Sequence, residues 1–493
     1  MFTPLPLSQW NERTAAHLLS RAGFGGTPEE IAALQRKGLG PAVRDLVDPG
    51  PEASNLAPPD WAHPKNIRDL RTSARTAPDP SQKKAKMQEL RMMEGQQILD
   101  LRRWWLERMR HGPAPLLEKL TLFWHGHFAT SIQKVKDAYW MWLQNDTLRR
   151  NAFGCFADLT RKMSRDPAMM IYLDLQQNRQ EHPNENWARE LMELFTVGIG
   201  HYSEPDIREA ARAFTGYRID LTNQQFRFAP FQHDRGNKTF MGRSGALAGD
   251  DIIDALVKQP ACARFIGQKL LRFFVEDEPA PNLVETMANC LRDHDFEIRP
   301  VLRELFTAAE FYSERVRHAQ IKSPVQFVVQ TARILQTPLP EPTIMQNAMR
   351  QMGQILFAPP NVKGWDGGKS WITTSTLLFR YNFANYLLNG DAMLPGNTLS
   401  RGPGRGPGLG GGIMAALAQR DQVEMTKLAP AELREKPRQL VDFVAARLFQ
   451  NQPLEKEANT FVQYLEARKP DTSDATMRGL VHLMMSTPQF QLT

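Results

Sequence analysis

The chain has 493 residues, of which 42% are hydrophobic and 23% are charged. This ordinary globular composition excludes a wholly disordered chain, and the length allows one large hydrophobic core or two smaller ones. The net charge of +7 is modest for this length, and no stretch approaches the roughly 20 apolar residues that a membrane-spanning helix requires.

The N-terminal segment and the cysteines both indicate the cellular compartment in which the protein is expected. The segment lacks the basic region and apolar run of a secretory signal, and the three cysteines are scattered and odd in number. We therefore expect a cytoplasmic protein in which Cys155, Cys262 and Cys290 are small buried side chains without disulfide bonds.

Helix signals dominate the chain, because apolar residues return every three to four positions between proline and glycine breakers. Predicted helices cover roughly residues 8–22, 28–48, 82–110, 113–124, 133–149, 184–197, 204–216, 260–276, 298–310, 323–336, 375–390, 430–449, 454–468 and 473–486. Strand signals are few, and the weak alternation between Tyr217 and Met241 predicts one small hairpin. No internal repeat of fixed period is present.

Basic residues are concentrated between Lys65 and Arg110, where a positive surface would suit nucleic acid or an anionic lipid or glycan. Acidic residues such as Glu89, Glu94 and Asp100 interleave with them, which is typical of a solvated helix face. Nucleic-acid binding is therefore the least favoured of the functions considered.

A Gly/Pro-rich segment divides the chain. Residues 395–412 are too rich in glycine and proline to fold alone, which predicts a loop or linker. We expect a main helical domain over residues 1–394 and C-terminal helices over 413–493 that pack on it. The predicted fold class is mostly α, a large multi-helix body with a small β-hairpin and a C-terminal helical extension.

The first polar motif is LTLFWHGHFATS, which contains His125 and His127. Two histidines at i and i+2 share a face only where the backbone is extended, and they diverge on a helix. Because Gly126 and the end of a predicted helix coincide here, we expect a non-helical backbone and two imidazoles that reach one metal ion.

The densest motif runs from His182 to Tyr217 and predicts two helices joined by a short turn. Asn186, Arg189, Glu190 and Glu193 line one polar face of the first helix at helical spacing. Such a face is often only a solvated surface with weak ion pairs. His182 and His201 fall at the ends of the same helix, and sites are often built at helix ends.

Two glycine-containing loops follow. FQHDRGNKTFMG holds His233, Asp234 and Lys238, which can face one site together with Arg212 from the preceding helix. LFAPPNVKGWDGGKSW holds Lys363 and Trp365, and its prolines and glycines predict a rigid, tightly turning loop. Such an aromatic loop fits sugar or peptide binding, or a packed lid, equally well.

These motifs together carry a family resemblance, along with RAGFG around Arg21 and IKSPVQFVV. From Ser8 to Gly390, and again weakly in the C-terminal tail, the chain resembles the bacterial domain-of-unknown-function family number 1800. The resemblance implies a mostly helical bacterial protein of a family without an established activity. It also implies a partner, because relatives are often encoded beside a sulfatase- or phosphatase-like protein. Some relatives carry export signals, so periplasmic export occurs within the family.

The leading hypothesis is an enzyme whose histidines and carboxylates converge in one pocket with a polar or anionic substrate. Its chemistry is metal-dependent through a divalent transition metal or rests on metal-free acid–base catalysis, and hydrolysis, group transfer and oxidation all remain open. The expected catalytic residues are His125, His127, Glu190, Glu193, His233 and Asp234. The expected substrate-binding residues are Asn186, Arg189, Arg212, Lys238, Lys363 and Trp365, and the expected metal ligands are His125, His127, His182 and His201.

The second hypothesis is a non-catalytic helical protein that chaperones or assembles a partner. In that case the polar clusters are networks that fix helix geometry. The two hypotheses differ in geometry: an enzyme brings the polar segments into one pocket, whereas an interaction protein leaves each cluster paired within itself.

Overall fold

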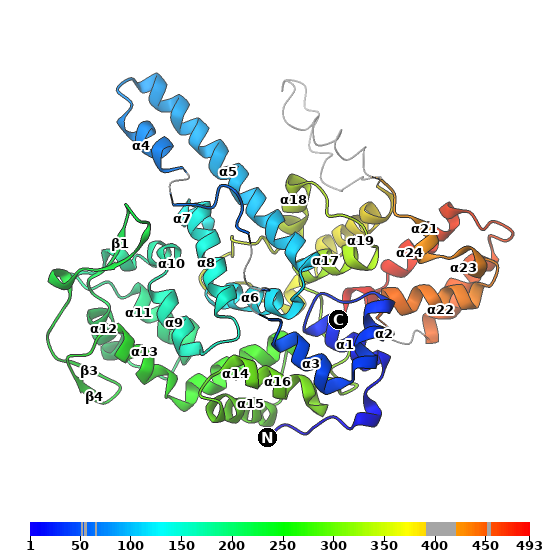
Figure 1. Cartoon of the computed structure of the whole chain (residues 1–493), viewed down its shortest axis with the longest axis horizontal. Helices are drawn as coiled ribbons and strands as arrows, with labels where there is room; N and C mark the ends of the chain where they lie inside the picture. Colours follow the sequence, from blue (N-terminus) through cyan, green and yellow to red (C-terminus); the bar gives the residue numbers. More distant parts are fainter. Residues whose placement is uncertain (51–52, 54–56, 65–66, 391–420, 451–454) are drawn as a thin grey trace.

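The computed structural model describes residues 1–493 except 51–52, 54–56, 65–66, 391–420 and 451–454 (Figure 1). The first group of helices is α1 Glu12–Arg21, α2 Pro28–Lys37, α3 Leu39–Val47, α4 Arg68–Thr76, α5 Pro80–His111, α6 Pro115–His127, α7 Ile132–Val135, α8 Ala138–Arg150, α9 Phe156–Ser164, α10 Pro167–Tyr172, α11 Asn186–Glu190 and α12 Glu204–Ala213. The second group is α13 Gly249–Val257, α14 Pro260–Phe274, α15 Pro281–Asp293, α16 Ile298–Thr307, α17 Pro324–Ile334, α18 Pro342–Met352, α19 Thr374–Asn389, α21 Met425–Leu428, α22 Pro437–Leu448, α23 Glu455–Glu466 and α24 Asp474–Met485.

The β structure consists of two short antiparallel hairpins in the described residues. Strand β1 Tyr217–Asp220 pairs with β2 Gln225–Phe228, and β3 Lys238–Phe240 pairs with β4 Arg243–Gly245. The mostly α fold with a small β element is confirmed. The prediction of one hairpin is corrected to two, and the second extends beyond Met241. The predicted linker at residues 395–412 lies outside the described residues.

Local sequence signals explain where the helices begin. Thr27, Ser203 and Thr373 form reciprocal capping boxes with the residue three positions later, which satisfies backbone N–H groups that lack a partner in the first turn. Prolines occupy the first turn of many helices, including α5, α6 and α14, where a missing N–H costs nothing.

Two hydrophobic clusters form the interior, and α6 contributes to both. The first joins α1–α3 with α9–α16, and the second joins α5 with α17–α19 and the C-terminal helices α21–α24. Trp124 of α6 packs in the first cluster and Leu122 in the second. In Figure 1, α6 lies in the middle of the molecule, while α4 and the adjoining end of α5 project from the body as an arm. None of the described helices is long and apolar enough to cross a membrane.

A buried carboxylate holds three helices together. Glu118 of α6 is 1% exposed and accepts two hydrogen bonds from the Arg149 guanidinium of α8, at 2.9 Å each. From α5, Arg108 Nε donates to it at 3.0 Å and Trp105 Nε1 at 2.8 Å. Burial alone would raise the pKa of Glu118, but the two guanidinium charges outweigh it, and the pKa is lowered.

Replacement of Glu118 by alanine should lower the free energy of unfolding by about 3–5 kcal/mol, because it leaves Arg149 buried without a counter-charge. Asp146→Ala is the matched control: it removes a pair with Arg150 four residues away, in which the arginine is 52% exposed, and should cost about 0.5 kcal/mol or less. Urea denaturation followed by circular dichroism measures both. Equal midpoints for the two variants would contradict the assignment.

Candidate functional site

The His-Gly-His motif is helical, so the prediction of a non-helical backbone is wrong. Helix α6 continues to His127, and both imidazoles are buried, His125 at 1% and His127 at 4% exposure. Residues two apart on a helix point in diverging directions, and each imidazole accordingly has its own set of partners.

His125 anchors the loop that contains Trp365. Its Nε2 accepts the backbone N–H of Phe357 at 3.0 Å, and Phe357 holds a left-handed φ of 62°. Burial lowers the pKa of His125 to about 3, so the ring is neutral and its Nδ1 carries the proton. That Nδ1 is buried without a hydrogen-bond partner among the described residues. The ring contacts Trp105 at 5.2 Å and Trp365 at 5.8 Å between centroids.

The loop at residues 357–371 lies against the end of α6 and beside Asp277, three residues beyond α14. A methyl group at Gly364 would lie 2.5 Å from the carbonyl oxygen of Gly126, so the loop backbone touches the centre of the His-Gly-His motif. A methyl group at Gly368 would lie 2.7 Å from Oδ2 of Asp277, just beyond α14. Two predicted segments are thereby brought together.

His127 forms a hydrogen-bonded pair with Lys269 of α14, which the sequence analysis did not select. Lys269 Nζ lies 3.2 Å from His127 Nδ1 and donates to the carbonyl oxygen of Leu194 at 2.9 Å. The other imidazole nitrogen, Nε2, lies 3.1 Å from the carbonyl oxygen of Phe195. A carbonyl only accepts, so Nε2 carries the proton and Nδ1 accepts from the lysine. Burial and then the Lys269 charge lower the pKa of His127 well below its usual range, which keeps the ring neutral.

A π-helical segment presents these two carbonyl groups. The predicted helix over 184–197 is α-helical only in α11, and it continues as a π-helix, η4 Leu191–Thr196, in which the N–H of Val197 donates to the carbonyl of Met192. The last carbonyls of a helix have no intrahelical partner, and here they accept from Lys269 and His127. Two residues after the segment, Gly198 has a φ of +80°, and the ring of Phe265 lies close to it.

Lys269 is partly exposed and forms no ion pair among the described residues. Burial, together with the smaller effects of the Arg272 and Lys363 charges, lowers its pKa to about 7. Arg272 and Lys363 are exposed. Lys363 pairs with Asp366 at 2.9 Å, and both of these side chains are about two-thirds exposed. We call Lys269, His127, Lys363 and Trp365 the Lys269 site.

Glu190 and Glu193 lie next to this site on the helix that presents the carbonyls. Both side chains are half-buried. Burial and the charge of Glu193 raise the pKa of Glu190, and Glu193 accepts a hydrogen bond from the hydroxyl of Tyr202 at 3.0 Å. Burial and that hydrogen bond raise the pKa of Tyr202 to about 12. The two carboxylates therefore form a partly desolvated pair.

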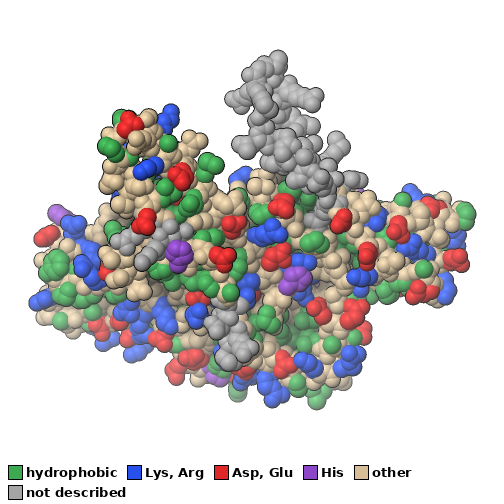
Figure 2. Space-filling view, turned by 45° about the horizontal axis from the view of Figure 1, so that its top comes forward, with side chains coloured by type: hydrophobic (Ala, Val, Ile, Leu, Met, Phe, Trp, Pro, Cys, Tyr) green, Lys and Arg blue, Asp and Glu red, His purple; other side chains and the backbone are tan. Residues whose placement is uncertain are grey.

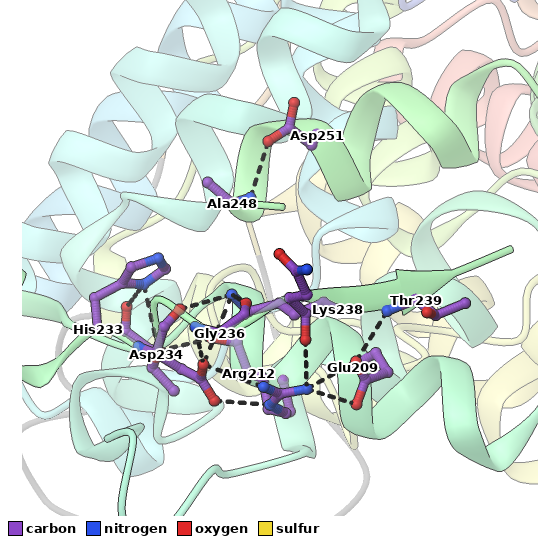
Figure 3. A network of polar contacts seen from close by, with 12 residues as sticks. Glu209, Arg212, His233, Asp234, Gly236, Lys238, Thr239, Ala248 and Asp251 are labelled. Atoms are coloured by element: carbon purple, nitrogen blue, oxygen red, sulfur yellow. Dashed lines mark hydrogen bonds and ion pairs between the residues drawn. The ribbon is translucent and has the colours of Figure 1, made fainter. Parts of the chain in front are cut away.

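The other predicted binding residues are engaged in pairs of their own. Arg189 binds Glu204 through both carboxylate oxygens and also Glu185. Figure 3 shows Arg212 between Asp234 and Glu209, with hydrogen bonds of 2.7–3.2 Å to the first and 2.9–3.0 Å to the second.

The same network includes the remaining residues of its loop. Lys238 is 1% exposed and donates to the carbonyls of Asp234 and Gly236, and His233 Nδ1 lies 2.9 Å from the carbonyl of Thr215. None of its described contacts reaches the Lys269 site. This network therefore fastens the hairpins to α12.

The four predicted metal ligands do not come together. His125 and His127 diverge on α6, whereas His182 and His201 are exposed on loops, and Asn186 is exposed at the start of α11. Within the described residues, the group of three potential ligands with closely spaced ligand atoms is Cys290, His294 and Glu304, which contains none of the four.

Comparison with known proteins places the chain in a family. The model of the family described as "Protein of unknown function (DUF1800)" matches residues 17–492. The chain belongs to this family. Searches of the curated proteins and of the solved structures found no match. Membership in DUF1800 confirms the resemblance and supplies no activity.

Lys269 was missed because its surroundings in sequence are unremarkable. It lies in an ordinary amphipathic helix, in which the residues LLRFF follow it directly. A lysine in such a helix is usually a charge on the solvated surface. The contact with His127 is 142 positions away in sequence. In this DUF1800 chain only the three-dimensional packing of α14 against α6 and η4 identifies it.

A test of the loop arrangement compares two glycines of the same loop. Gly364→Ala should lower the free energy of unfolding by about 1–3 kcal/mol more than Gly367→Ala. Both residues have positive φ, +90° and +77°, but a methyl group meets the Gly126 carbonyl only at the first and open space at the second. Thermal unfolding and the rate of tryptic cleavage after Lys363 and Lys369 measure the effect. Equal behaviour would show that the loop does not pack on α6.

Proposed function

We propose that this DUF1800 protein is an enzyme that acts on an anionic substrate at the Lys269 site, with Lys269 as the group that transfers a proton. The observation that carries the proposal is the half-buried Lys269 amine, held by His127 and a helix-end carbonyl, with no carboxylate partner and a pKa lowered to about 7. An acid or base is most effective when its pKa lies near the working pH.

The hydrogen bonds of Lys269 leave one position open. An ammonium group has three donors, and two are directed at His127 Nδ1 and the Leu194 carbonyl. The third direction holds a proton in the charged form and the lone pair in the neutral form. Because His127 is held in one tautomer by the Phe195 carbonyl, the orientation of the amine is fixed before substrate arrives. Lys269 can therefore take a proton from substrate and return it.

The charges around this amine favour an anionic substrate. Arg272 and Lys363 are close enough to depress the pKa of Lys269, and Lys369 acts on Asp277 at the other end of the same loop. A bound anion would offset these positive charges in a partly desolvated setting, where electrostatic interactions are stronger than in water. Trp365 would supply an apolar wall beside His125.

Exposure separates Lys269 from other lysines with a depressed pKa. Burial lowers the pKa of Lys119 and Lys322 to about 7 as well, but these side chains are only 7% and 2% exposed. Lys119 is directed at Gln326, and Lys322 donates to the carbonyl of Phe490 at 2.7 Å. They hold the interior together, whereas the Lys269 side chain is partly exposed.

Chemical labelling tests the state of this amine. Lys269 should react with trace acetic anhydride with a half-maximal rate near pH 7, because the neutral amine is the reactive form. Inorganic phosphate or sulfate should slow the reaction, while the exposed Lys258 should show no such protection. Peptide mass spectrometry measures both sites. The proposal would be contradicted if Lys269 were not acetylated at neutral pH, or if neither phosphate nor sulfate slowed its acetylation.

The proposed proton transfer by Lys269 also predicts how its replacement and the pH change the rate of catalysis. With a chromogenic phosphate or sulfate ester that the protein turns over, Lys269→Met should lower kcat/KM by about 100-fold or more, and Lys258→Met should leave it unchanged. If Lys269 acts as base, the rate rises with pH through about 7 and then levels, since the amine works when deprotonated. A flat profile in the parent protein would contradict the assignment.

A second candidate is the interaction protein, and the projecting arm favours it. Helix α4 packs on α5 through the Arg71–Glu94 pair at 2.9 Å. Arg71 also pairs with Asp137 at the start of α8, and beyond this contact the arm projects from the body in Figure 1. Figure 2 shows hydrophobic side chains on the arm beside charges of both signs, and Met92 and Met93 are 69% and 39% exposed. Flexible exposed methionines suit protein contacts. The sulfatase- or phosphatase-like neighbour implied by the resemblance is the partner proposed for this arm.

Met92→Asp should weaken a complex with that neighbour by at least about tenfold, since a charge placed in an apolar contact must be desolvated. Leu7→Asp changes an equally exposed hydrophobic residue, 80% exposed near the N-terminus, and should have no effect. Size-exclusion chromatography and calorimetry of the purified pair measure binding. No complex, or equal loss in both variants, would remove the arm from consideration.

A further inference from the structure

Three side chains with metal-binding atoms meet where α15 ends beside α16. Cys290 lies in the last turn of α15 and His294 is its C-terminal cap, four residues later, so the two side chains lie one above the other on one helix face. Glu304 of α16 faces them. The thiol, imidazole and carboxylate ligand atoms all lie within 4.8 Å of one another.

The contacts among these residues are already close to the spacing of metal ligands. His294 Nε2 lies 2.7 Å from Glu304 Oε1, and the Cys290 thiol donates to Glu304 Oε2 at 3.4 Å. With bonds of about 2.0 Å to nitrogen or oxygen and about 2.3 Å to sulfur, tetrahedral zinc holds its ligand atoms roughly 3.3–3.8 Å apart. Small rotations of the imidazole and carboxylate would admit an ion between the three groups.

The cluster is closed on one side and open on the other. Cys290 is 4% exposed, whereas the side chains of His294 and Glu304 are 31% and 43% exposed. An ion can therefore reach the site from solvent through His294 and Glu304 and bind the Cys290 thiolate, which is shielded from solvent. Burial and then the Glu304 carboxylate raise the pKa of the Cys290 thiol, and of the weaker charges Asp293 raises it and the chain N-terminus lowers it.

We propose that Cys290, His294 and Glu304 bind one zinc-class divalent ion. One sulfur, one imidazole nitrogen and one carboxylate oxygen form a donor set typical of zinc. Binding releases the thiol proton to solvent and forms the metal–sulfur bond, so the ion is not oxidised or reduced. Three protein ligands leave the fourth position for water. The ion would join the end of α15 to α16, and it is independent of the Lys269 site.

Cobalt(II) is the probe, because tetrahedral Co²⁺ reports a thiolate ligand by its sulfur-to-metal charge-transfer absorption. The full-length chain, freed of any affinity tag and stripped with a chelator, should bind one equivalent and release it to Zn²⁺. Cys290→Ser should abolish the charge-transfer band. His294→Gln and Glu304→Gln, which change half-exposed side chains, should weaken binding at least about tenfold and retain the helical circular dichroism of the parent.

Two controls keep the outcome specific. Cys155→Ser removes a different cysteine, which is partly exposed and whose thiol donates to the carbonyl of Asp295, and it should leave the cobalt spectrum intact. Lys269→Met should do the same, since that variant tests the other site. No stoichiometric uptake, a thiolate band that persists in Cys290→Ser, or unchanged affinity in folded His294→Gln and Glu304→Gln would overturn the proposal.

Discussion

One buried carboxylate determines where the candidate site lies. Glu118 satisfies two guanidinium groups and the indole of Trp105, and it thereby fixes α5 and α8 against α6. Trp105 then packs with its ring against His125, which holds the backbone of Phe357 and so the start of the loop. An unpaired charge in this interior would cost several kcal/mol. The geometry of the site therefore depends on an ion pair that takes no part in the chemistry of the site.

Elsewhere in the interior, backbone carbonyls receive the buried cations. Arg21 donates to the carbonyls of Val275 and Val316, Lys322 to that of Phe490, and Lys269 to that of Leu194. A carbonyl at a helix end has only a partial negative charge, so it satisfies hydrogen bonds and leaves most of the positive charge uncompensated. Burial accordingly lowers the pKa of Arg21 to about 9 and that of Lys269 to about 7. Only Lys269 of these three lies where solvent reaches it.

The sequence was sufficient for the fold class and for many helix starts, because apolar spacing and caps such as Ser203 act locally. It drew attention to His125, His127 and Trp365, since histidines and a glycine-rich aromatic loop are unusual, and their functional role stays a prediction. The sequence did not predict the helical backbone at Gly126, because packing of α6 against both hydrophobic clusters keeps it helical despite the glycine. It could not show that Arg189, Arg212 and Lys238 are occupied by neighbouring carboxylates and carbonyls, nor that Lys269 meets His127. Those facts depend on contacts between distant segments.

The π-helix after α11 carries a consequence for how tolerant the site is to change. A π turn accommodates one residue more than an α turn between hydrogen-bonded groups, and the Val197–Met192 bond has this wider spacing. The directions of the Leu194 and Phe195 carbonyls thus depend on the number of residues in the segment rather than on any side chain. Loss of a single residue would let the segment relax into an α-helix and rotate both carbonyls away from Lys269 and His127.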